Sequence, residues 1–260
     1  MDTSKKNNNI KSVVKAISII ELLVLNGKAI SLTEMAKELG MARSTVHGLA
    51  ATLLDLGYLS QNPETGHYEL GTKLYEVGNA VANNWTEKSV AKPYITYLVE
   101  KLKETVHMAK LSDGKVLYID KYESTHSIRI VTETGLKLPA HCTGVGKVLL
   151  AYLSKAELDY ILKKNPLEYY TDKTITDRHE FDIELEKIRQ RGYATDSQEF
   201  VAGLACVAAP IFNHQNVVIA ALSISAPVSR MKLDYMEMIK DDLLKACKEI
   251  SIKLGSTIYE

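Results

Sequence analysis

Apolar side chains in the N-terminal third of the chain recur at the three- and four-residue steps that are typical of amphipathic helices. The first such run predicts a helix whose apolar face packs on the core. That face consists of Val13, Ile17, Ile20 and Val24. The run ends at Asn26-Gly27, and glycine is a common residue just after a helix.

Two shorter helices are expected next. Ser31 and Glu34 have the Ser-x-x-Glu spacing of a capping box, in which each side chain accepts a backbone N–H of the other residue, and Gly40 ends this helix. Ser44 is expected to cap the third helix, which ends at Gly57.

A hairpin and a fourth helix follow. Residues 58–70 alternate between apolar and polar on either side of turn-forming residues at 62–66, which predicts a β-hairpin. Three helices and a hairpin, in this order, are typical of a winged helix-turn-helix. The helix from Gly71 to about Trp85 has an apolar stripe with no partner in so small a unit, so we expect it to pair with a second copy of the chain. The stripe consists of Leu74, Val77, Val81 and Trp85.

The rest of the chain has the pattern of a larger α+β region. Strands are expected at 106–111, 115–122, 127–132, 193–196, 204–212 and 217–225. Helices are expected around 94–102, after Pro139 and over 233–254. Another helix should begin at a capping box formed by Ser154 and Glu157. A further helix is expected over 177–191, with Thr176 as its cap and Gly192 at its end.

Composition narrows the class of protein. The 260 residues are 46% hydrophobic and 25% charged, as in soluble globular proteins, and 32 basic residues balance 32 acidic ones. No apolar stretch approaches the roughly 18–20 residues that span a bilayer, and the polar N-terminus does not resemble a secretion signal, so we expect a cytoplasmic protein. Three cysteines without CxxC spacing argue against a disulfide framework and a zinc ribbon.

The third helix has the residues of a DNA-reading helix. In a helix-turn-helix the second helix of the pair lies in the major groove, with its first residues at base edges and phosphates. Here Arg43 can bind a phosphate or a guanine, Ser44 and Thr45 are short phosphate donors, and His47 projects toward a base edge. His67, near the hairpin tip, is the fifth candidate.

The charge of this region supports DNA binding only weakly. Residues 1–80 carry eight Lys or Arg and eight Asp or Glu. Winged helices also serve as protein-docking modules, which therefore stays an alternative. If the unit binds DNA, dimerisation and the flexible arm at 1–11 should contribute much of the affinity.

Several enzyme motifs fail on spacing. Gly144-Val145-Gly146-Lys147 lacks the first glycine and the final Ser or Thr of a Walker loop. The adjacent side chains of His141 and Cys142 point apart, so they do not form a nucleophile and its base. The remaining histidines have no metal-ligand spacing, so no metal or cofactor is expected.

A small-molecule site is better supported. The backbone amides at the start of a helix at Gly144-Val145-Gly146 favour an anion. Asp196 follows a strand, and Ser223 and Ser225 face the same side of another. These groups suit a small hydroxylated acid. The same residues also admit a purely structural explanation, in which Asp196 caps a loop and the serines pair with neighbouring strands.

Several longer motifs resemble one family, the isocitrate lyase regulator (IclR) family of bacterial transcription factors. They are LTEMAKELGMARSTVHGL, GHYELGTKL, LPAHCTGVGKVLLA, RGYATDSQEFVAGLACVAAPIF and VVIAALSISAPVSR. The resemblance implies an α+β protein that assembles as a homodimer or a dimer of dimers. Its parts would be a flexible arm at 1–11, a winged helix-turn-helix at 12–72, a linker and dimerisation helix at 73–88, and a GAF-like antiparallel-sheet effector domain at 89–260.

The resemblance also implies which residues contact the effector. They are Gly144, Val145, Asp196, Cys206, Ser223 and Ser225. The chain departs from the family pattern at Gly48, where arginine is usual, and at Gln198 and Glu199, where two acids are usual. These departures remove one expected DNA contact and lower the charge beside the effector.

The expected function is a DNA-binding regulator of a catabolic operon, a repressor rather than an activator, whose partners are a double-stranded operator and a small effector. The effector would be a sugar acid or another small organic or aromatic acid. Two alternatives stay open: an enzyme that uses Cys206 or Cys142 as its nucleophile, and a protein-docking module.

Overall fold

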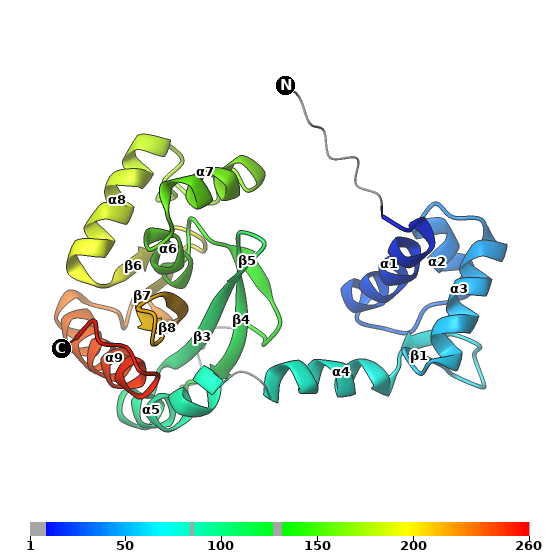
Figure 1. Ribbon diagram of the computed structural model, residues 1–260, viewed down its shortest axis with the longest axis horizontal. Helices are drawn as coiled ribbons and strands as arrows, with labels where there is room; N and C mark the ends of the chain where they lie inside the picture. Colours follow the sequence, from blue (N-terminus) through cyan, green and yellow to red (C-terminus); the bar gives the residue numbers. More distant parts are fainter. Residues whose placement is uncertain (1–8, 84–85, 127–131, 260) are drawn as a thin grey trace. The chain divides into compact units, whose positions relative to one another are not determined.

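The computed structural model describes residues 9–83, 86–126 and 132–259. The chain divides into two compact units, Met1–Trp85 and Thr86–Glu260 (Figure 1). The first is a winged helix-turn-helix, and the second is an antiparallel sheet covered by helices.

The first unit has the predicted order of elements. They are α1 (Lys11–Asn26), α2 (Leu32–Glu38), α3 (Arg43–Asp55), β1 (Leu59–Gln61), β2 (Tyr68–Leu70) and α4 (Thr72–Asn83). The capping box of Ser31 and Glu34 is confirmed. The predicted cap of α3 is wrong: Ala42 precedes the helix without a side-chain cap, and Ser44 lies inside the first turn.

The core face predicted for α1 is wrong for three of its four residues; the fourth, Ile20, is half-buried and packs against the core. Ile19 and Leu23 are its buried residues, whereas Val13, Ile17 and Val24 are exposed. The helix is apolar around most of its circumference, so its periodicity fits two faces equally well. The face with Ile19 is buried because α3 and β2 pack against it.

The second unit is built on a six-stranded sheet with the order β5-β4-β3-β8-β7-β6, in which neighbours are antiparallel. The strands are β3 (Thr105–Ser112), β4 (Lys115–Tyr122), β5 (Lys137–Pro139), β6 (Ala194–Ser197), β7 (Leu204–Phe212) and β8 (Val218–Pro227). The strand predicted at 127–132 falls almost entirely outside the described residues.

Helices cover both faces of this sheet (Figure 1). They are α5 (Thr86–Leu102), α6 (Gly144–Ala151), α7 (Lys155–Lys164), α8 (Arg178–Arg191) and α9 (Leu233–Lys253). Helices α6, α7 and α8 share one core cluster with the sheet, and α5 and α9 pack together on the other side. The capping box that opens α7 is confirmed, but α8 is capped by Asp177 and not by Thr176.

The sequence predicts one linker helix at 73–88, whereas the structure places the described residues of this range in two helices, α4 and α5. α4 ends at Asn83, and residues 86–88, placed in the linker from the sequence, begin α5, where Glu87 is buried against the sheet and pairs with Lys110. None of the helices in the described residues is long and apolar enough to cross a membrane.

Candidate functional site

Two rows of inward-facing side chains cross the sheet beneath α6. Strand register aligns the first row on β3, β8, β7 and β6, and the second row lies two residues further along the same strands. The first row is Thr105, Ser225, Cys206 and Asp196. The second row is His107, Ser223, Ala208 and Ala194. Alternation along each strand turns both rows to the face that α6 covers.

The start of α6 approaches these rows closely. A Cβ on Gly144 would lie 2.6 Å from the Cys206 sulfur and 3.3 Å from Cβ of Ala208. Only glycine fits between the helix and the sheet at this point. A Cβ on Gly146 would lie 2.1 Å from the carbonyl oxygen of Ala140, so this position also requires glycine. Gly144 therefore allows α6 to approach β7 closely, and Gly146 allows the helix to pack against the chain just after β5.

A cavity of about 350 Å³ lies between the rows and the start of α6. All six residues expected to contact an effector line it: Gly144, Val145, Asp196, Cys206, Ser223 and Ser225. The segment 200–204 and the side chains of Leu136 and Leu138 form its apolar wall. The structure thus brings together residues that are up to 81 positions apart in the sequence. That they bind an effector stays a prediction.

Asp196 borders the cavity and also stabilises the loop that follows β6. It lines the cavity, and its Oδ1 also accepts a hydrogen bond from the Glu199 backbone N–H at 2.7 Å, which caps the loop after β6. Only 4% of the residue is exposed. Burial raises the pKa of this carboxyl to about 7, although the Glu199 amide and Lys147 oppose the shift. A carboxyl with this pKa can hold or release a proton near neutral pH.

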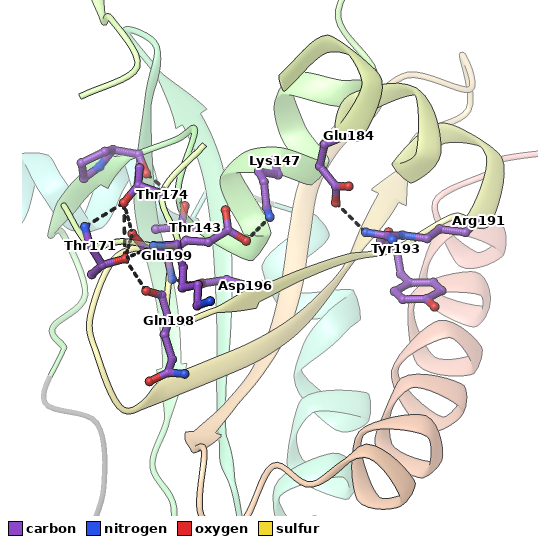
Figure 2. A network of polar contacts seen from close by, with 12 residues as sticks. Thr143, Lys147, Thr171, Thr174, Glu184, Arg191, Tyr193, Asp196, Gln198 and Glu199 are labelled. Atoms are coloured by element: carbon purple, nitrogen blue, oxygen red, sulfur yellow. Dashed lines mark hydrogen bonds and ion pairs between the residues drawn. The ribbon is translucent and has the colours of Figure 1, made fainter. Parts of the chain in front are cut away.

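A buried ion pair lies near Asp196 (Figure 2). Lys147 of α6 donates to Oε1 of Glu199, and both residues are buried. Burial raises the pKa of Glu199 even with Lys147 beside it. The hydroxyl of Thr171 donates to the Gln198 carbonyl, and that of Thr174 to the Glu199 carbonyl, both at 2.6 Å. Glu199 therefore neutralises Lys147, and the two threonine hydroxyls fix the loop that borders the cavity.

The thiols have the environment of structural cysteines. Cys206 and Cys142 are buried, and burial raises the pKa of each to about 12. A thiolate is the reactive form, and neither residue forms one readily. His141, next to Cys142 in the chain, has its Nε2 2.8 Å from the Glu168 carbonyl oxygen. These contacts do not support a thiol nucleophile.

His107 also lines the cavity, although its sequence pattern does not predict this position. Its ring is 2% exposed, lies 4.8 Å from the Tyr118 ring and lines the cavity with it. Burial, together with the charge of Lys121, lowers its pKa to about 4, so the ring is neutral at physiological pH. The only sequence signal was a histidine at an inward position of an alternating strand. Among the described residues, no three His, Cys, Asp or Glu side chains lie together as metal ligands would.

The candidate DNA-contacting residues lie on α3 and beside the hairpin. Arg43, Ser44 and His47 are exposed on α3, whereas Thr45 is half-buried. His67 is half-buried too, and its carbonyl accepts the Asn62 N–H that closes the hairpin tip. Three of the five side chains are thus fully available to a ligand such as DNA.

A helix-turn-helix unit joined to an antiparallel-sheet domain is the architecture of a transcriptional regulator with a separate effector domain. Family models agree: the "IclR helix-turn-helix domain" matches residues 12–63, and "Bacterial transcriptional regulator IclR C-terminal" matches residues 80–252. The chain belongs to the IclR family of bacterial transcriptional regulators.

Individual relatives match over nearly the whole chain. The HTH-type transcriptional regulator XynR of Escherichia coli is 36% identical over 95% of this chain and 98% of its own. The transcriptional repressor IclR of the same organism is 32% identical over 97% of this chain and 93% of its own. The crystal structure of Thermotoga maritima IclR superimposes with a TM-score of 0.79 at 32% identity, covering 95% of this chain and all of that one.

Proposed function

We propose that this regulator represses a catabolic operon and that a small hydroxylated organic acid, bound in the cavity beneath α6, controls its affinity for DNA. The observation that carries the proposal is the convergence of six family-pattern residues on one cavity. The name of the relative IclR, a transcriptional repressor, supports repression.

The cavity suits an acid whose body carries hydroxyls. Its volume of about 350 Å³ is in the range of small-ligand pockets. The Val145 amide at the start of α6 and a protonated Asp196 can both donate to a carboxylate. Neutral hydrogen-bonding groups occupy the rest of its polar wall: His107, Tyr118, Thr132, Thr143, Ser223 and Ser225.

Control by the acid requires a difference in binding between two states. The effector changes DNA affinity only if it binds the DNA-competent arrangement of two heads more or less tightly than another arrangement. DNA must then change the affinity for the effector by the same factor. A coupling free energy of about 1–3 kcal/mol is typical of such systems. The two heads of a dimer would read two half-sites of a near-palindrome.

Fluorescent DNA from the region upstream of the gene, titrated with protein at several salt concentrations, tests the proposal. A panel of sugar acids and aromatic acids is then added, including 4-hydroxybenzoate, which is bound in the crystal structure of an IclR homolog from Microbacterium hydrocarbonoxydans. We expect tight, salt-sensitive binding that one acid weakens by about 5- to 150-fold.

The variant Asp196→Ala should lose the response to this acid and keep its affinity for DNA without effector. Asp241→Ala, which removes an exposed carboxylate of α9, is the matched control and should respond like the wild type. An unchanged response of Asp196→Ala would exclude the cavity. Weak DNA binding without salt dependence would favour the protein-docking module instead.

A further inference from the structure

His107, which lines the cavity, has one ring nitrogen without a hydrogen-bond partner in the part of the chain that the structure describes. Its Nε2 lies 2.6 Å from the Thr132 hydroxyl, whereas Nδ1 is buried and has no hydrogen-bond partner among the described residues. Buried polar atoms in folded proteins are nearly always paired, and an unpaired one costs free energy. Because the ring lines the cavity, a ligand bound there can supply the missing partner of Nδ1.

The imidazole of His107 favours a hydroxyl as the ligand group that contacts it. A neutral imidazole has one N–H donor and one lone pair, so the role of Nδ1 depends on which nitrogen carries the proton. The Thr132 hydroxyl can donate or accept and therefore fits either form. A ligand hydroxyl has the same property at Nδ1, whereas a carboxylate only accepts and a methyl group does neither.

The sheet register places this group far from Asp196. His107 is on β3 and Asp196 on β6, with β8 and β7 between them, so three strand spacings of about 4.8 Å separate the two residues. Ser223 is the register partner of His107 and lines the same end of the cavity. A ligand whose carboxylate is near Asp196 and the start of α6 must extend along the sheet to reach His107.

We infer that His107, with Ser223 beside it, binds a hydroxyl at the end of the effector remote from its carboxylate, and that this contact determines which acids act as effectors. The inference rests on the proposed function of the cavity. It narrows the effector to acids with a terminal or para hydroxyl, such as sugar acids and 4-hydroxyaryl acids.

Matched pairs of acids test the inference by calorimetric titration of the full chain. The pairs are 4-hydroxybenzoate with benzoate, 6-hydroxyhexanoate with hexanoate, and gluconate with 6-deoxygluconate. In the wild type we expect at least one hydroxylated acid to bind about 10-fold or more tightly than its partner, because the partner leaves Nδ1 unpaired.

Two variants separate a specific contact from a structural effect. His107→Leu should bind both members of the pair equally, and His107→Asn, which keeps a polar atom attached to Cγ at the position of Nδ1, should retain part of the preference. His126→Leu removes an exposed histidine outside the cavity and should behave like the wild type.

The outcomes distinguish the inference from the proposed function. Acids that bind without regard to the remote hydroxyl, or a preference that persists in His107→Leu, would overturn the role of His107 and leave the cavity as an effector site. Failure of every acid to bind the wild type would remove the proposed function, and the inference with it.

Discussion

Asp196 links the stability of the protein to pH. Its pKa is about 7 in the folded chain and close to the ordinary 3.8 in the unfolded chain. The folded protein therefore keeps a proton that the unfolded chain releases between these two pH values. Stability is lost as the pH rises through this window, and the loss is complete above about pH 7.

Asp196→Asn should remove this loss. The amide oxygen can still accept the Glu199 N–H, and the side chain has no charge to desolvate. We expect the variant to exceed the wild type in free energy of unfolding by on the order of 2–4 kcal/mol near pH 8, and the difference to disappear toward pH 4.

Urea denaturation of both proteins across this pH range measures the difference. Asp241→Asn, an exposed position, should follow the wild type at every pH. A difference between Asp196→Asn and the wild type that does not vary with pH would show that Asp196 keeps an ordinary pKa.

The sequence predicts some residues of the cavity and not others. Ser223 and Ser225 were placed on one face by alternation alone, and the start of α6 was predicted as an amide cluster. Their meeting with Asp196 depends on the strand order β8-β7-β6, which no local pattern contains. His107 was missed because a single histidine in a strand looks the same whether it faces solvent, the core or a cavity.

At the scale of elements, Gly48 is an unusual residue for the middle of α3, the helix proposed to contact DNA. It is exposed in the middle of α3, and a Cβ at this position would meet nothing within 4 Å. Glycine inside a helix costs about 0.5–1 kcal/mol relative to alanine. The position is thus open to a side chain and lies on the helix that also presents Arg43 and His47.

Gly48→Arg should stabilise the first unit and add a phosphate contact. We expect the slope of log affinity against log salt concentration to steepen by about 1 for each head. Gly48→Ala is the matched control, because it changes helix propensity without adding charge. Equal slopes for the two variants would show that this position faces away from the DNA backbone.

Helix boundaries and helix faces differ in how well the sequence predicts them. α1 ends at Asn26 and α8 at Arg191, as expected, because the glycine after each adopts the left-handed conformation that side chains disfavour. The buried face of α1 was predicted wrongly because both of its apolar stripes satisfy the helical period. Only the position of α3 and β2 decides between them.

At the scale of the whole molecule, α4 has apolar side chains without partners in the described part of its own unit. Tyr75 is 76% exposed and Val77 45% exposed. Two DNA-binding heads held together bind paired half-sites with an avidity that can exceed single-site affinity by about 10²–10⁴-fold. Pairing of α4 with its counterpart in a second chain would supply this connection.

Val77→Asp tests the pairing because it places a charge on the exposed stripe without disturbing the fold of one chain. We expect weaker dimerisation in sedimentation experiments and a fall of about 100-fold in affinity for DNA with two half-sites, with affinity for a single half-site unchanged. Val217→Asp makes the same substitution at an exposed valine in the turn before β8 and should change neither quantity. If Val77→Asp matched this control, the heads would have to be joined through another surface, and the exposed apolar face of α1 would be the next position to substitute.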